Sequence, residues 1–115
     1  MPLYYPPNNL FGRGGTVLSP TVPINIIVWR APFACTVNAV KGYVVGATGT
    51  TVNARKNGSL NHLSSNLSLG STDTWLDGGA VQNTSYAIGD KMEIMITSVS
   101  GSPTEVAIQV ELTRV

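Results

Sequence analysis

In the stretch KMEIMITSVSGSPTEVAIQVELTRV, residues 91–115, apolar side chains recur at every second position on both sides of a short polar turn. They are Met92, Ile94 and Ile96 before the turn, and Val106, Ile108, Val110 and Leu112 after it. A period of two over this length predicts two strands, each with one buried face and one face that meets water or a partner. Because only the turn SGSP separates them, we expect the two strands to pair as a hairpin.

Further strands are predicted before this stretch, with turn residues between them. Two are expected over residues 24–30 and 35–45, with a break at Ala31-Pro32 because proline cannot donate to a strand ladder. Asn57-Gly58 predicts a tight hairpin turn, since both central residues of such a turn need a positive φ. The remaining expected features are short strands near Leu67 and Trp75, a loop at Gly78-Gly79, and a turn over residues 87–90.

These signals together predict an all-β fold. No run of ten residues shows the apolar spacing of a helix, and 115 residues suffice for one domain with a sizeable core. About eight strands with connections of uneven length favour a jelly-roll-like antiparallel β-sandwich over a simple meander barrel.

The first 22 residues differ from the rest, and we expect them to form an extended arm ahead of a β-sandwich domain over residues 23–115. Prolines, which fix backbone angles and remove amide donors, occur in this segment at Pro2, Pro6, Pro7 and Pro20. The arm also carries large apolar side chains that it cannot bury by itself, at Tyr4, Tyr5, Leu10 and Phe11. These four residues are therefore predicted to dock on another chain.

Composition excludes several classes of partner. Charged residues make up 11% of the chain, against roughly 25% in ordinary domains, so its solubility depends on hydroxyl and amide groups. The net charge is +1 and the basic residues are scattered, which argues against nucleic-acid binding. The most apolar stretch, residues 22–29, is far shorter than the ~20 residues of a membrane helix, and no signal peptide is recognisable. We expect synthesis in a cytoplasm and no membrane anchor.

No arrangement of residues predicts catalysis, a metal site or a cofactor, so we expect a protein that is not an enzyme. Cys35, the single cysteine, is expected to be a buried strand residue. His62, the single histidine, is expected to face solvent on a hairpin. Of the carboxylates, Asp73, Asp77 and Asp90 lie in turn contexts that favour capping of local amides, while Glu93 and Glu111 are assigned to polar strand faces.

The two tryptophans lie in different surroundings. Trp29 ends a strongly apolar strand, and together with Ile27 and Met95 it is predicted to lie in a subunit interface or in the core between the sheets. The sequence leaves both alternatives open. Trp75 is surrounded by Ser, Thr and Asp, and is therefore a candidate for stacking against a sugar.

Several segments resemble small structural proteins of tailed-bacteriophage virions. They are VWRAPFACTVNAVKGYVVG (residues 28–46), TVNARKNGS (51–59), TWLD (74–77), AIGDKMEIMITSVSGSP (87–103) and VAIQVELTR (106–114). The resemblance spans residues 28–114 and consists of packing and turn residues, with no catalytic signature. Within this group the chain is most similar to capsid decoration, or cement, proteins.

This resemblance implies a jelly-roll body, usually a homotrimer, that binds the major capsid protein on the outer surface of the virion and stabilises the shell. The chain would be made in the cytoplasm of the bacterial host. The alternative is the distal domain of a head or tail fibre, which has a similar fold but binds a host glycan or protein receptor. In that alternative Trp75 would contact the glycan.

Overall fold

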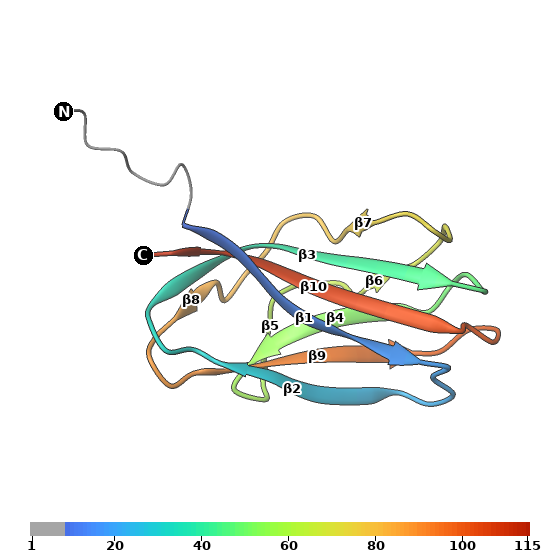
Figure 1. Cartoon of the computed structure of the whole chain (residues 1–115), viewed down its shortest axis with the longest axis horizontal. Coiled ribbons are helices and arrows are strands. Elements are labelled where there is room, and N and C mark those ends of the chain that lie inside the picture. The colour runs from blue at the N-terminus through green and yellow to red at the C-terminus, as the bar shows by residue number, and fades with distance from the viewer. Residues whose placement is uncertain (1–8) are drawn as a thin grey trace.

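The computed structural model describes residues 9–115, which form two antiparallel β-sheets packed face to face (Figure 1). The first sheet, sheet A, contains β1 (Leu10–Leu18), β10 (Glu105–Arg114) and β3 (Cys35–Val45), with the short strands β7 (Leu76–Asp77) and β8 (Ser85–Tyr86) paired to β3. Sheet B contains β2 (Ile24–Arg30), β9 (Lys91–Ser98) and β4 (Thr51–Lys56), with β5 (Leu60–Asn61) and β6 (Leu67–Ser68) paired to β4. The predicted all-β sandwich is confirmed.

The predicted hairpin over residues 91–115 is wrong, because its two strands lie in different sheets. β9 pairs with β2 and β4, whereas β10 pairs with β1 and β3 (Figure 1). Residues 99–104 therefore carry the chain from one sheet to the other. Each strand lies in the interior of its sheet with a partner on both sides, and alternation shows only that one face of a strand is buried. It does not show which strand is the neighbour.

The core lies between the two sheets and is built from the alternating residues that define the strands. β10 contributes Val106, Ile108, Val110 and Leu112, and β9 contributes Met92, Ile94 and Ile96, all of them buried. Cys35 is buried at the start of β3, as predicted. At about 25 cal/mol per Å² of apolar surface removed from water, this double layer is the main source of stability.

Local turn predictions agree with the structure. β2 and β3 span residues 24–30 and 35–45, and Asn57 and Gly58 both have positive φ, of 54° and 78°, where the chain turns from β4 into β5. β6 and β7 lie at the predicted short strands. The chain turns again at residues 87–90 before entering β9, with the Asp90 N–H donating to the Ala87 carbonyl at 3.1 Å.

The N-terminal segment differs from the expected arm. Residues 10–18 form β1, which pairs with β10 along its whole length, from Leu10 opposite Thr113 to Leu18 opposite Glu105 (Figure 1). Leu10 and Phe11 therefore belong to sheet A. The strand was not predicted because glycine occupies three of its nine positions and weakens the alternation of apolar residues. Tyr4 and Tyr5 lie outside the described residues.

Candidate functional site

One long edge of the sandwich is closed by an aromatic cluster. Phe11 of β1, Trp29 of β2 and Phe33 pack edge to face, with ring centroids 5.5–6.0 Å apart. The guanidinium of Arg13 lies over Phe11 and Trp29, at 5.2 and 5.4 Å from the ring centroids. Such aromatic and cation–π contacts stabilise the closure between the two sheets. Trp29 thus packs within the chain, at the border of the core.

The other two residues grouped with Trp29 lie elsewhere. Met95 is almost fully buried on the outer face of sheet B, opposite Asn53 and Asn25 on the neighbouring strands. Ile27 is 60% exposed. Ile27 is therefore the one member of the predicted group that an additional chain could readily contact.

Ile27 is one of four exposed apolar residues just before and within the first half of β2, Val22, Ile24, Ile26 and Ile27, which we call the apolar edge. Ile24 and Ile26 lie opposite the core residues Ile96 and Ile94, whereas Ile27 lies opposite Glu93, so the isoleucines flank the open strand on both faces. β2 pairs with β9 on one side, and no strand within residues 9–115 pairs with its other side. Backbone donors and acceptors and large aliphatic side chains are therefore presented together along this edge.

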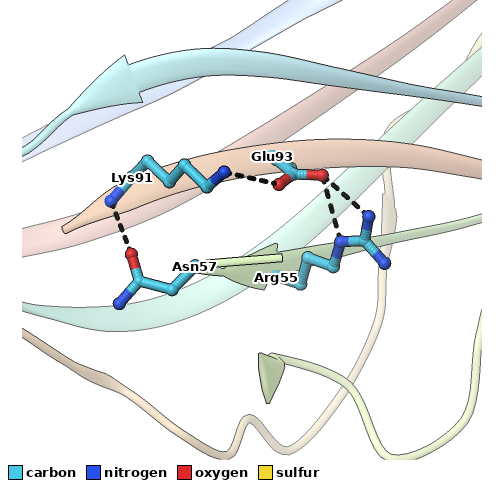
Figure 2. A network of polar contacts seen from close by, with 4 residues as sticks. All are labelled: Arg55, Asn57, Lys91 and Glu93. Atoms are coloured by element: carbon cyan, nitrogen blue, oxygen red, sulfur yellow. Dashed lines mark hydrogen bonds and ion pairs between the residues drawn. The ribbon is translucent and has the colours of Figure 1, made fainter. Parts of the chain in front are cut away.

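A polar network covers part of the outer face of sheet B (Figure 2). Arg55 donates from Nε and Nη2 to Glu93 Oε2 at 3.1 and 2.9 Å, and Lys91 Nζ lies 3.8 Å from Glu93 Oε1. The Lys91 backbone N–H donates to the side chain of Asn57 at 3.0 Å. Glu93 was assigned to a polar strand face, but its neighbours bury it. Its charge is compensated within the chain, as a structural ion pair requires.

His62 is fully buried, so the prediction that it faces solvent is wrong. Its backbone N–H donates to Ala54, which directs the ring toward the core, where Nε2 lies 2.7 Å from Tyr86 Oη and Nδ1 lies 3.3 Å from the Gln82 carbonyl. Burial lowers the pKa of His62 and raises that of Tyr86. The pair is therefore neutral: Nδ1–H donates to Gln82, and the Tyr86 hydroxyl donates to Nε2.

Two turn carboxylates cap local amides, as predicted. Asp77 Oδ1 accepts from the Gly79 N–H at 2.8 Å. Asp90 Oδ2 accepts from the Ala87 N–H at 2.9 Å, and this bond, helped by Asn57, lowers the pKa of Asp90. Asp73 adopts a positive φ of 59°. Within the described part of the chain, no group of three or more His, Cys, Asp or Glu residues could hold a metal ion.

The outer face of sheet A carries a hollow beside Trp75. Trp75 directly precedes β7, is 50% exposed, and packs on Tyr43 of β3 with centroids 5.1 Å apart and planes at 52°. The hollow has a volume of about 510 Å³ and is lined by Trp75, residues 12–16 of β1 and residues 107–109 of β10. A smaller adjoining hollow of about 250 Å³ is lined by Trp75, Lys41, Gln109 and Glu111. We call the two together the Trp75 trough.

The sequence singled out Trp75 but missed the rest of the trough. Gly12, Gly14 and Gln109 come from strands at opposite ends of the chain, which become neighbours through the pairing of β1 with β10. The available signal was the run FGRGGT, since glycine inside a strand often marks a close approach by a ligand or another backbone. We expected residues 1–22 to form an extended arm, so the strand and its glycines were not predicted.

No helix in the described residues is long and apolar enough to cross a membrane. Comparison of the chain with protein-family models, with curated proteins and with solved structures gave no match.

Proposed function

We propose that this chain is a non-enzymatic structural subunit of a phage virion, a decoration protein that binds the outer capsid and stabilises the shell. The observation that carries the proposal is the apolar edge, a surface suited to contact with protein. The sequence resemblance to phage decoration proteins supplies the identity of the partner, the major capsid protein.

The apolar edge favours a protein that works in an assembly. Natural sheets protect exposed edges with charged residues, proline or short strands, because an unprotected edge pairs with other chains. β2 has seven residues, and no charged residue or proline occurs in it before Arg30. Its one irregularity is a shift in register between Ile27 and Trp29. Coverage by another protein would satisfy the backbone groups and remove the isoleucines from water.

A jelly-roll class for the body, and a homotrimer as the working unit, belong to the same proposal. In support of the first, the long strands β1 to β4 alternate between the two sheets in chain order, and the chain crosses between the sheets again from β9 to β10. In support of the second, three subunits bound together would multiply individually weak edge contacts. Sedimentation velocity of the purified chain tests the trimer directly, and a monomer at micromolar concentration would contradict it.

The test of the capsid function is a binding experiment with two matched variants. Ile24→Lys/Ile27→Lys places charges on the apolar edge, while Ile88→Lys places one at a similarly exposed residue in the turn before β9. Each purified protein is sedimented with capsids of the encoding phage that were assembled without it. We expect wild type and Ile88→Lys to saturate the shell in hundreds of copies, and the edge variant to lose at least tenfold in affinity.

Two results would overturn the decoration function, and a third would overturn the assignment of the docking surface. Wild-type protein that does not bind the capsid excludes a decoration function, and a copy number of a few per particle at a vertex or tail tip supports the fibre alternative. Normal decoration by the edge variant would show that the apolar edge is not the docking surface. A third variant lacking residues 1–8 tests Tyr4 and Tyr5 separately, because β1 remains intact.

A further inference from the structure

We propose that the Trp75 trough is a binding site for a neutral oligosaccharide. The proposal does not depend on attachment to a capsid, because the trough lies on sheet A whereas the apolar edge follows β2 of sheet B. Three observations support it: a floor built on the glycines of β1, an aromatic wall against which Tyr43 packs, and polar groups whose charges cancel.

The floor of the trough is formed by glycine on the outer face of β1. Gly14 is required by packing, since a Cβ there would lie 2.0 Å from the carbonyl oxygen of Ile108. Gly12 is not required by packing in the same way, because a Cβ there would meet only the flexible side chain of Gln109, at 2.9 Å from Nε2. Glycine within a strand costs about 0.5–1 kcal/mol relative to alanine. The Gln109 side chain lies over Gly12, so glycine at this position leaves room for that side chain on the floor of the trough, where its amide can meet a ligand.

The wall of the trough is the indole of Trp75. Half of this residue is exposed, yet Tyr43 packs against it and β7, which follows immediately, pairs with β3 through Leu76 and Gly42. The ring is thus oriented before any ligand arrives, which reduces the entropy lost on binding. A pyranose presents a face of C–H groups that packs on such a ring, while its hydroxyls remain at the rim.

The rim supplies hydrogen-bonding groups suited to hydroxyls. Gln109 offers one acceptor and two donors, and Lys41 offers donors beside the carboxylates of Asp77 and Glu111, at 3.8 and 3.9 Å. A sugar hydroxyl both donates and accepts, so a mixed set of this kind can bind adjacent hydroxyls. Arg13 also lines the trough, so the four charged groups Arg13, Lys41, Asp77 and Glu111 sum to zero, and Lys41 already faces both carboxylates. This balance favours a neutral sugar over a sialylated, sulfated or phosphorylated one.

The experiment uses an array of neutral and acidic oligosaccharides from bacterial and eukaryotic surfaces, followed by titration of each hit. Binding is measured by NMR from the indole N–H signals, because Trp29 lies in the aromatic cluster and serves as an internal control for Trp75. We expect one or more neutral oligosaccharides to bind and to shift the Trp75 signal with little effect on that of Trp29. Trp75→Ala should weaken binding at least tenfold and Gln109→Ala several-fold, while Ile88→Ala should leave it unchanged.

The outcomes separate this site from the proposed capsid function. The Ile24→Lys/Ile27→Lys variant should still bind the sugar, and Trp75→Ala should still decorate capsids. The saccharide proposal is overturned by an array without a neutral hit, by binding confined to acidic glycans, or by a hit whose affinity Trp75→Ala leaves intact. Loss of capsid binding in Trp75→Ala would also overturn it, since the trough would then be a protein contact.

Discussion

The buried pair of His62 and Tyr86 provides a sharp test of the structure. Tyr86→Phe removes one oxygen atom and leaves the ring in contact with Trp29 and His62, whose centroids lie 6.1 and 5.5 Å away. The hydroxyl is the partner of His62 Nε2 at 2.7 Å, so the variant leaves a buried acceptor unsatisfied. We expect the free energy of unfolding to fall by about 1–3 kcal/mol.

The assay is urea denaturation at pH 8, followed by tryptophan fluorescence. With a denaturant dependence of about 1–1.5 kcal/mol per molar urea, the loss corresponds to a midpoint lowered by about 0.7–3 M. Tyr43→Phe is the matched control, because it removes the same oxygen from a ring on the outer face of sheet A. Its effect should stay within about 0.5 kcal/mol.

A double-mutant cycle completes this test. His62→Leu leaves the Tyr86 hydroxyl unsatisfied, whereas Tyr86→Phe/His62→Leu removes both polar partners together. The double variant should therefore cost less than the sum of the two single variants, by at least about 1 kcal/mol. A Tyr86→Phe protein as stable as wild type, or strictly additive effects in the cycle, would refute the hydrogen bond as described.

Three further predictions concern pH, β1 and its glycines. Burial lowers the pKa of His62, so at acidic pH the unfolded chain binds a proton at this residue more readily than the folded chain does. Thermal melts from pH 8 to pH 5 should therefore show stability falling below about pH 6.5, and the fall should be less steep in His62→Leu. Phe11→Ala should cost about 2–4 kcal/mol in urea unfolding, and a change under 0.5 kcal/mol would show that β1 is not anchored by the aromatic cluster. Gly14→Ala should lower the melting temperature markedly more than Gly12→Ala, because only the first places a Cβ against backbone; equal effects would contradict the close approach to Ile108.

The strands that could be predicted from the sequence are those whose evidence is local. Residues 24–30 and 35–45 alternate or run apolar between turn residues, and Asn57-Gly58 specifies its turn through backbone conformation alone. The pairing of strands is not local. β9 and β10 follow one another in sequence and both face the core, but nothing in their alternation distinguishes neighbours in one sheet from strands on opposite sheets.

Two other differences between the predicted and the observed structure also arise from contacts between segments distant in the sequence. β1 was predicted as part of an extended arm, but its hydrogen-bonded pairing with β10 and the packing of Phe11 in the aromatic cluster hold it as a strand despite its glycines. His62 looked like a solvent-facing hairpin residue because its partners, Gln82 and Tyr86, come from later segments of the chain. Trp75 could be singled out from its polar neighbours, but the rest of its trough depends on strand pairing.

The position of β9 and β10, each between two earlier strands of its sheet, has a consequence for folding during synthesis. Sheet A joins β1 to β3 only through β10, and sheet B joins β2 to β4 only through β9 (Figure 1). On the ribosome, the first four strands emerge long before the two strands that link them. The apolar side chains of these four strands stay uncovered until β9 and β10 pair with them. Such pairing closes very long loops, which is the slow step in folds dominated by contacts distant in sequence. We therefore expect the nascent chain to depend on the ribosome or on chaperones until residue 114 has left the exit tunnel.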